Sequence, residues 1–419
     1  MDLAPGLKLT EVGVIPEDWK CATIGELVAE GVLEQPMDGN HGNIHPKSGD
    51  FVSFGIPFVM ANNLKGGRVD LASCSFIRKE HADTLQKGFS VPGDVLLTHK
   101  ATIGNTAVVG NITTEYIMLT PQITYYRVAN ASRLSNLYLR SFFDGNSFQG
   151  VLQSRSGGGT RSYIGITAQL NLPVALPPTK AEQEAIAEAL SDADALIESL
   201  ERLIAKKRLI KQGAMQELLT GKTRLPGFDG EWEVMRLGEL IAIRNQKINT
   251  LGAPEAAYCV ELEQIEQGTG QLHRYSDARS RQTVKYKFRD SDVLFGRLRP
   301  YLRKYWWANR DGVCSTEIWP ITTPSDQLIS GYLFQVVQTD SFIEAANVSY
   351  GTHMPRADWN AIDSLEIIIP IDVNEQTAIV KALSDMDSEI SGLEVKLSKA
   401  RLLKQGMMQE LLTGRIRLV

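Results

Sequence analysis

The sequence predicts an α+β protein in which two globular units alternate with two long helices. One observation is a helical segment that occurs twice: "KQGAMQELLTGKTRL" at 211–225 and "KQGMMQELLTGRIRL" at 404–418 agree at twelve of fifteen positions. A second is a fainter repeat that marks the start of each half. A third is a series of short runs rich in β-branched and aromatic residues, separated by Gly, Asn and Asp, which is typical of strands and turns.

The helical repeat extends far upstream of these two endings. At an offset of 193 positions, the segment from Glu182 matches the segment from Glu375, and each follows an apolar run that contains proline. Apolar residues alternate four and three positions apart, as in a helix that packs on another helix. They are Ile186, Leu190, Ile197, Leu200 and Ile204 in the first copy and Ile379, Leu383, Ile390, Leu393 and Leu397 in the second.

Two equal apolar seams in one chain are self-complementary, so we expect the two helices to pack on each other. The alternative is that they are unrelated surface helices, each lying on its own core. Both copies end at a Thr-Gly pair, where glycine supplies the left-handed residue that closes a helix.

The fainter repeat sets the boundaries of the globular units. "IPEDWKCATIGEL" from Ile15 resembles "FDGEWEVMRLGEL" from Phe228. Farther on, "GDVLLTHKATIGNTAVV" from Gly93 faces "SDVLFGRLRPYLRKYWW" from Ser291, and "SGGGTRSYIG" from Ser156 faces "VSYGTHMPRAD" from Val348. The predicted organisation is a unit at 1–178, a helix at 179–221, a unit at 222–371 and a helix at 372–419.

Composition indicates a soluble globular protein. The 419 residues are 43% apolar and 22% charged, and no apolar run approaches the roughly 18 residues that span a bilayer. The first residues lack the pattern of a secretory signal, and the four cysteines are scattered without a CxxC pair. We therefore expect a cytoplasmic protein without membrane contact.

No catalytic or metal-binding motif emerges. "TGKT" at 220–223 lacks the first glycine of a P-loop and follows a helix, and there is no GxGxxG. The single Pro-Pro, in "LPPT", lacks the neighbours of an amino-methyltransferase motif. His41 and His45 are separated by glycine and asparagine and followed by Pro46, which does not suit a zinc pair.

Charge is unevenly distributed in a chain whose formal net charge is −5. Residues 272–310 contain eleven Arg and Lys and three Asp, a local net charge of +8, with interleaved aromatic residues. Guanidinium groups on such a loop can reach phosphates or guanine edges, so this pattern favours nucleic-acid contact. The alternative is a solvated basic edge strand.

Candidate DNA-contacting residues follow from this pattern in both units. In the second unit they are Arg297, Arg299, Arg303 and Lys304, with His353 and Arg356 from the segment that faces the glycine-rich loop of the first. In the first unit they are polar residues, Thr98, Lys100 and Asn105, with Arg155, Arg161 and Tyr163 around "SGGGTR". That loop could equally be a flexible connection.

These features together resemble the specificity subunit of type I restriction-modification systems. The resemblance covers essentially the whole chain and rests on "GVIPEDWKCATIGEL", "RLPGFDGEWEVMRLGEL", the two helices that begin with Glu-Gln and the paired "KQGxMQELLTG" endings. It implies two target recognition domains, each followed by a long helix, with the helices forming an antiparallel coiled coil in a circular, pseudo-two-fold arrangement.

The resemblance also implies function and partners. The chain would bind double-stranded DNA at a bipartite, asymmetric target and hold two modification (methyltransferase) subunits and, through them, two restriction subunits. S-adenosylmethionine, ATP and magnesium would bind the partner subunits, and this chain would carry no catalytic residue, metal or cofactor. Alternatives are a specificity subunit of a methylation-only or orphan system, or a coiled-coil scaffold that does not bind DNA.

Overall fold

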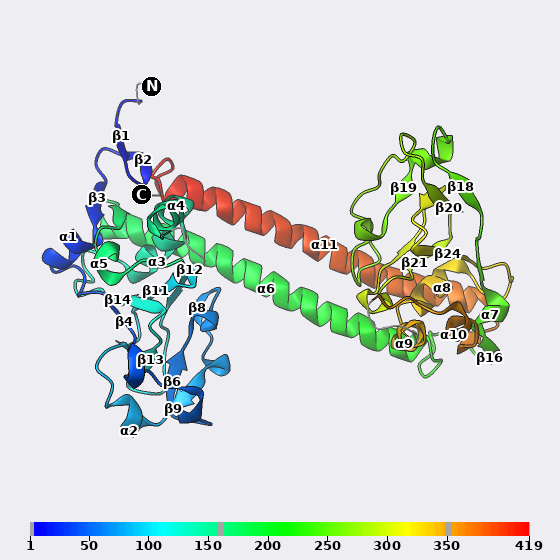
Figure 1. Cartoon of the computed structure of the whole chain (residues 1–419), viewed down its shortest axis with the longest axis horizontal. Coiled ribbons are helices and arrows are strands. Elements are labelled where there is room, and N and C mark those ends of the chain that lie inside the picture. The colour runs from blue at the N-terminus through cyan, green and yellow to red at the C-terminus, as the bar shows by residue number, and fades with distance from the viewer. Residues whose placement is uncertain (1–3, 158–161, 348–353, 419) are drawn as a thin grey trace. The chain divides into compact units, whose positions relative to one another are not determined.

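The computed structural model describes residues 4–157, 162–347 and 354–418 (Figure 1). The chain divides into two compact units: unit 1 comprises residues up to 201 together with those from 396, and unit 2 comprises 202–395. The long helices are α6 (Lys180–Leu218) and α11 (Val373–Leu411), each 39 residues long. Each unit therefore contains one globular domain, the first half of one long helix and the second half of the other.

Domain 1 precedes α6 and combines two larger sheets with short helices. The larger sheets have the strand orders β4-β14-β11-β12-β8-β7 and β10-β13-β6-β9-β5, and the strand pairs β1-β2 and β15-β3 complete the domain. Its strands are β1 (Leu7–Thr10), β2 (Gly13–Pro16), β3 (Lys20–Thr23), β4 (Met37–Asp38), β5 (Phe51–Val52), β6 (Ile56–Val59), β7 (Leu64–Lys65), β8 (Gly67–Val69), β9 (Ser75–Ile77), β10 (Phe89–Ser90), β11 (Val95–Lys100), β12 (Thr102–Val108), β13 (Ile117–Leu119), β14 (Ile123–Tyr126) and β15 (Pro173–Leu176). Its helices are α1 (Ile24–Ala29), α2 (Lys79–Ala82), α3 (Asn136–Asp144), α4 (Asn146–Arg155) and α5 (Ile166–Gln169).

Domain 2 lies between α6 and α11 and repeats this plan with smaller sheets. Their strand orders are β17-β24-β21-β22, β18-β20-β23-β19 and β16-β25. The strands are β16 (Trp232–Arg236), β17 (Ala242–Ile243), β18 (Lys247–Asn249), β19 (Cys259–Val260), β20 (Val284–Phe288), β21 (Val293–Gly296), β22 (Tyr305–Trp307), β23 (Gly312–Cys314), β24 (Ile318–Thr322) and β25 (Glu366–Pro370). The helices are α7 (Leu237–Leu240), α8 (Ser330–Val336), α9 (Asp340–Ala346) and α10 (Trp359–Asp363).

The α+β class expected from the sequence is confirmed. The β-rich runs "DVLLTHK", "QITYYRV" and "LEIIIPI" contain β11, β14 and β25, and each domain also has two consecutive helices, α3 with α4 in domain 1 and α8 with α9 in domain 2. Gly221 and Gly414 both have φ of +69°, so glycine does follow each long helix in the left-handed conformation.

The end of each long helix completes the core of the other helix's domain. In unit 1, Leu411 at the end of α11 and the following Leu412 are buried in the same apolar cluster as Trp19 and the first turns of α6. Figure 1 shows this red end of α11 against α4, near β2. In unit 2, Leu218 at the end of α6 and the following Leu219 are buried with the domain 2 core and the first turns of α11. Neither domain closes its core with contiguous chain alone.

Ion pairs within each unit show that the two helices run antiparallel. The pairs are Glu182–Arg417, Asp194–Lys404 and Glu201–Arg401 in unit 1 and Glu375–Arg224, Asp387–Lys211 and Glu394–Arg208 in unit 2. Each pair of unit 1 becomes a pair of unit 2 when its acidic residue is shifted by +193 and its basic residue by −193. The sequence repeat is therefore a repeat of contacts.

In the outermost pair of each unit, the acidic side chain is almost completely buried. Only 1% of the Glu182 and Glu375 side chains is exposed. Arg224 donates from Nε and Nη2 to the two oxygens of Glu375 at 2.5 and 2.6 Å. Arg417 donates from Nη2 to Oε2 of Glu182 at 2.7 Å, and its Nε forms an ion-pair contact with Oε1. A carboxylate taken out of water requires such a partner, so each arginine compensates a charge in the core of its unit.

The seam residues divide into two groups by burial. Ile186, Leu190, Ile379 and Leu383, near the helix starts, are at most 1% exposed because they also pack on a domain core. Toward the helix centres, Ile204 and Ile390 are buried, whereas Ile197, Leu200, Leu393 and Leu397 are half-buried. Apolar burial is therefore concentrated at the helix ends.

Loss of one arginine of the outer pairs should destabilise the unit that contains it. We expect Arg417→Met to leave Glu182 buried without a partner, and Arg224→Met to do the same to Glu375, lowering the midpoint of thermal unfolding by about 5 °C or more in calorimetry. Arg415→Met, at an exposed arginine near the same helix end, is the control and should have little effect. Equal melting of all three variants would contradict a structural role for the outer pairs.

Candidate nucleic-acid interface

Two loops that are distant in the sequence meet in each domain at the end of a central strand. In domain 1, Lys100 at the end of β11 bridges Tyr163, the backbone N–H of Ile164 donates to the carbonyl of His99 at 3.1 Å, and that of Ala101 donates to Ser162 at 3.2 Å. We call residues 98–102 and 162–164 the bridged loops of domain 1. They contain candidate residues from both of the segments singled out in the first unit.

Domain 2 has the same backbone arrangement. Leu298 bridges Arg356, the N–H of Ala357 donates to the carbonyl of Arg297 at 2.8 Å, and that of Arg299 donates to Pro355 at 2.8 Å. Residues 296–300 and 355–357 are therefore the bridged loops of domain 2. The repeat predicted from "GDVLLTHKAT" and "SDVLFGRLRP" aligns Lys100 with Leu298, in agreement with these bonds.

The bridged loops also share an unusual backbone conformation. Ala101 and Arg299, which are aligned by the repeat, have φ of 67° and 51°. A side chain in the left-handed region costs free energy, and such residues gather at functional sites. The surrounding hydrogen bonds hold this conformation at the same point of both domains.

The first-domain candidates differ in accessibility. Tyr163 is 46% exposed, and the Lys100 ammonium lies 5.9 Å from its ring centroid. Asn105 is exposed, but Thr98 is fully buried and its Oγ1 accepts from the Asn105 backbone N–H at 2.9 Å. Arg155 donates to the Asn171 carbonyl at 2.6 Å and pairs with Glu11. Lys100, Asn105 and Tyr163 are thus the candidates best placed to meet a ligand.

Two candidates, Arg161 and His353, lie outside the described residues. The first belongs to the glycine-rich loop of domain 1, and the second belongs to the matching loop of domain 2.

In domain 2, three arginines gather at the bridged loops. Arg297 lies 5.4 Å from the Trp319 ring centroid, and Arg356 forms a bidentate ion pair with Glu317 at 3.0 and 2.9 Å. Arg299 is exposed, and within the described ranges its side chain has no hydrogen-bond or ion-pair partner. The site thus offers at least one guanidinium to solvent.

The remaining candidates of domain 2 are engaged with the protein. Arg303 pairs with Asp340 and donates to the carbonyl of Gln338 at 3.3 Å. Lys304 donates from Nζ to the Leu262 carbonyl at 2.7 Å. These contacts tie the turn after β21 to neighbouring segments, so both side chains would have to leave a partner to reach DNA.

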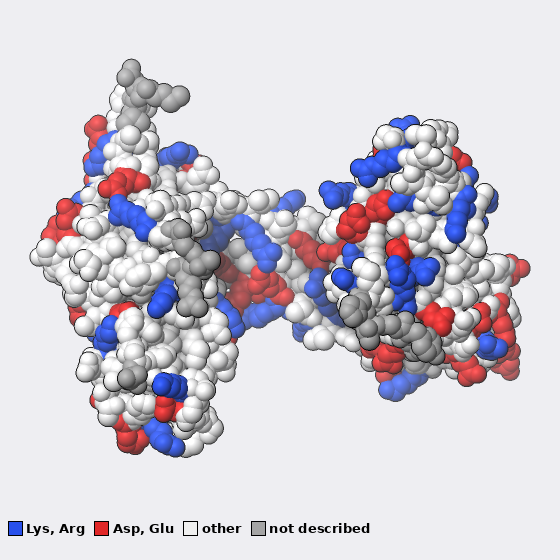
Figure 2. Space-filling model, viewed as in Figure 1, with Lys and Arg blue, Asp and Glu red and all other residues white. Residues whose placement is uncertain are grey.

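The basic stretch 272–310 is less positive in the fold than in the sequence. Lys285 and Lys287 pair with Glu261 and Glu255, which lie outside the stretch, as does the Asp340 partner of Arg303. Figure 2 accordingly shows acidic and basic side chains interleaved over the face of domain 2 in view. The local charge of +8 is a property of a sequence window and overstates the field at the surface.

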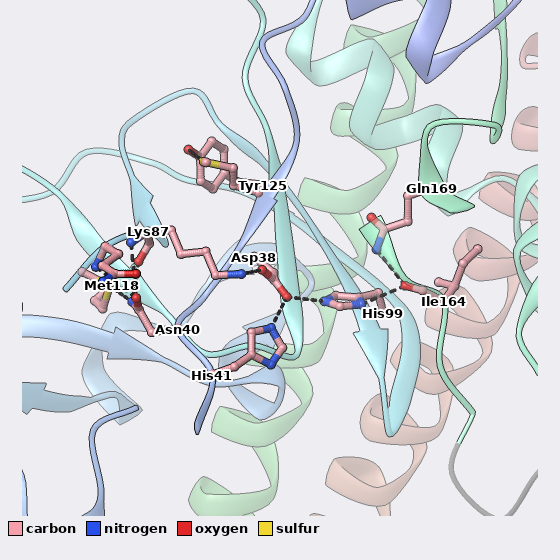
Figure 3. Close-up of polar contacts among 11 residues, drawn as sticks. Asp38, Asn40, His41, Lys87, His99, Met118, Tyr125, Ile164 and Gln169 are labelled. Atoms are coloured by element: carbon pink, nitrogen blue, oxygen red, sulfur yellow. Dashed lines mark hydrogen bonds and ion pairs between the residues drawn. The ribbon is translucent and has the colours of Figure 1, made fainter. Parts of the chain in front are cut away.

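A polar network around the buried residues Asp38 and His99 supports the bridged loops of domain 1 (Figure 3). Asp38, 3% exposed, accepts from His41 Nε2 at 2.6 Å and pairs with Lys87, and His99 Nε2 lies 3.9 Å away. Burial raises the pKa of Asp38, but the hydrogen bonds from Lys87 and His41 outweigh burial and hold it below its ordinary value.

The same network reaches the exposed loop. The His99 ring, fully buried, has a hydrogen bond of 3.0 Å between Nδ1 and the Ile164 carbonyl, and it lies 5.7 Å from the Tyr163 ring. Burial lowers the pKa of His99. Sequence reasoning missed Asp38 and Lys87, because no periodicity or motif connects a residue on β4 with one some fifty positions later.

The residues described contain no group of three or more His, Cys, Asp or Glu side chains arranged to hold a metal ion. None of the helices in these ranges combines the length and apolar character needed to span a bilayer.

Comparison with known proteins identifies the family. A family model described as the type I restriction modification DNA specificity domain matches residues 16–206 and 229–400. The chain is 23% identical over 445 aligned positions to the putative MjaX type I restriction enzyme specificity subunit of Methanocaldococcus jannaschii, covering 98% of this chain and 96% of the relative. It is 24% identical over 216 positions to the EcoDI specificity subunit of Escherichia coli, covering 51% and 46% of the two chains.

Solved structures agree on the fold. The S subunit of a type I restriction-modification system from M. genitalium superposes with a TM-score of 0.60 at 12% identity, covering 98% of each chain. A chain from a structural study of type I complex assembly superposes with a TM-score of 0.53 at 16% identity, covering 96% and 99%. The family model matches more than half of the chain, and the matched segments include parts of both domains and of both long helices. The chain therefore belongs to the type I restriction-modification DNA specificity family, as a specificity subunit.

Proposed function

We propose that this specificity subunit binds a bipartite, asymmetric DNA target, each domain reading one half through its bridged loops. The observation that carries the proposal is that both domains hold the same backbone arrangement, with a left-handed residue at the same point, but present different side chains. Lys100 and Tyr163 occupy the bridge in domain 1, and Leu298 and Arg356 occupy it in domain 2. Base edges are distinguished by hydrogen-bond patterns, so different side chains on one scaffold suit two different half-sites.

We also propose that the chain itself is non-catalytic and docks two modification subunits, which carry S-adenosylmethionine. Restriction subunits, with ATP and magnesium, would join through them. The support is a duplicated exposed stripe on the long helices. Leu209, Gln212, Gly213 and Gln216 are exposed on α6 at helical spacing, and Leu402, Gln405, Gly406 and Gln409 are their identical, exposed counterparts on α11.

The exposed stripe has features of a docking surface rather than of a solvated face. Leu209 and Leu402 are 68% and 65% exposed. A Cβ added at Gly213 or Gly406 would meet nothing within 4 Å, so space for a close-packed partner helix is open there. Folding does not require the exposed stripes of the two helices to be identical. Binding of two identical partner subunits does require two identical surfaces.

The docking proposal predicts a loss of partners in steps. Gly213→Glu and Gly406→Glu add a charged side chain in open space and raise helix propensity, so the chain should fold normally. Each single variant should bind one modification subunit instead of two, and the double variant should bind none, as measured by native mass spectrometry of the co-expressed complex. Gly392→Glu, also open and exposed but without a glycine counterpart in α6, is the control and should retain two.

Specificity should be separable by domain. Exchange of residues 20–176 for the matching segment of another family member moves β3 together with its partner β15 and keeps Glu182 with α6. One half of the methylated motif should change and the other should stay, as read from the methylated sites of host DNA. A change in both halves would contradict separate reading by the two domains.

Arg299 should contribute charge to DNA binding. We expect Arg299→Ala to weaken binding to all sequences and to reduce the slope of log affinity against log salt by about one. Arg299→Lys should restore the slope, because it keeps the charge. Lys381→Ala removes an exposed cation from α11 and serves as the control. If Arg299→Ala and Lys381→Ala titrate alike, the bridged loops of domain 2 do not face DNA.

A further inference from the structure

The pair of Arg356 with Glu317 stands out among the ion pairs of domain 2. Arg356 donates from Nε to one carboxylate oxygen of Glu317 at 3.0 Å and from Nη2 to the other at 2.9 Å. Both side chains are accessible, at 44% and 29% exposure. The guanidinium pulls the pKa of Glu317 below its ordinary value, so the carboxylate is charged at neutral pH.

Stability alone does not account for this geometry. The structural pair of the same domain, Arg244 with Asp292, has a carboxylate that is 3% exposed and also accepts from the backbone N–H of Arg289. Glu317 lacks such burial, and accessible ion pairs contribute little to folding. A bidentate contact between two accessible side chains fixes direction more than it adds stability.

The contact leaves the outer edge of Arg356 available. A guanidinium has five N–H donors in a planar fork. Glu317 takes one from Nε and one from Nη2, so three remain, on Nη1 and the far side of Nη2. Two of these form a terminal fork that matches the O6 and N7 acceptors of guanine in the major groove.

The backbone makes the pair part of the bridged loops. The N–H of Arg297 donates to the Glu317 carbonyl at 2.9 Å, and Leu298 bridges Arg356. Arg297 itself lies over Trp319 and also lowers the pKa of Glu317. One carboxylate is thus paired with one guanidinium and influenced by a second, and a net positive charge remains to attract DNA.

Domain 1 provides an internal comparison. The N–H of His99 donates to the Gln122 carbonyl at 2.9 Å, which places Gln122 where domain 2 has Glu317, and Tyr163 stands where domain 2 has Arg356. The same backbone therefore carries a carboxylate and a guanidinium in one domain and an amide and a phenol in the other.

We infer that Glu317 is a positioning residue that orients Arg356 to read one guanine in the half-site of domain 2. This inference rests on the proposed function and adds the base, the reading residue and the residue that holds it. Arg356 contacts the base, whereas Glu317 acts only through Arg356.

The test uses the assembled methyltransferase and a set of duplexes in which each base pair of the second half-site is replaced in turn. Glu317→Gln should reduce discrimination at one G·C pair by about tenfold, within the range of one bidentate base contact. Arg356→Lys, which keeps the charge and loses the fork, should reduce discrimination at the same pair. The double variant should be no worse than either single variant, because the two side chains form one unit.

The control separates positioning from charge and folding. Glu255→Gln also removes one carboxylate from an accessible ion pair of domain 2, with Lys287. Both glutamine variants should bind unrelated DNA equally or slightly more tightly than wild type and should melt normally, but only Glu317→Gln should relax one base pair.

Several results would overturn the inference. One is that Glu317→Gln discriminates between base pairs as well as wild type at every position of the second half-site. Another is that this variant loses discrimination at several positions and also has a lowered melting temperature. A third is that the second half-site contains no G·C pair. If the wild-type assembly shows no sequence preference from domain 2 at all, the proposed bipartite reading fails as well, and that result is recognised from the wild type alone.

Discussion

The rest of the structure depends on one constraint. An acidic residue at the start of each long helix is buried, and it is paired with an arginine that follows the end of the other long helix. Glu182 and Glu375 are taken almost completely out of water, and each is compensated by an arginine that lies more than 150 positions away in the sequence. An unpaired carboxylate in that position would be strongly destabilising, so each domain requires the far end of the other domain's helix. The leucines shortly before each arginine, Leu411 and Leu412 or Leu218 and Leu219, join the same core, which couples apolar burial to the charge pairing.

This coupling separates what must repeat from what can vary. The contacts at the helix ends are repeated in both units, because each unit has a glutamate, an arginine and a capping glycine at corresponding positions of the repeat. The bridged loops repeat only in backbone: their hydrogen bonds connect N–H groups and carbonyls, which every residue but proline provides. A side chain there can change without disturbing the bonds that hold the loop. Under the proposed function, this is what allows two half-sites to be unrelated while the partner subunits see two equivalent surfaces.

The parts that sequence predicted are those governed by local periodicity and by the internal repeat. The seam of four- and three-residue spacing and the Thr-Gly endings predicted long helices at 179–221 and 372–419, and the structure has α6 at Lys180–Leu218 and α11 at Val373–Leu411. Side-chain partners were harder to anticipate. Thr98 looked like a polar reader, but it lies on a strand in which both faces are buried. Likewise, the carboxylates that neutralise Lys285 and Lys287 come from earlier segments, and no window count includes residues brought in by the fold.

The charge distribution bears on how affinity and specificity are divided. Non-specific DNA affinity grows with the number of phosphates neutralised, and the chain as a whole has a formal net charge of −5. At the bridged loops of domain 2, Arg356 is held by Glu317 and Arg297 lies over the Trp319 ring, whereas Arg299 is exposed. Held cations lose less entropy on meeting a base edge, and they tolerate a wrong base poorly because their direction is fixed. On the proposed function, held side chains of this subunit select the sequence, and exposed cations such as Arg299 add affinity for the phosphates.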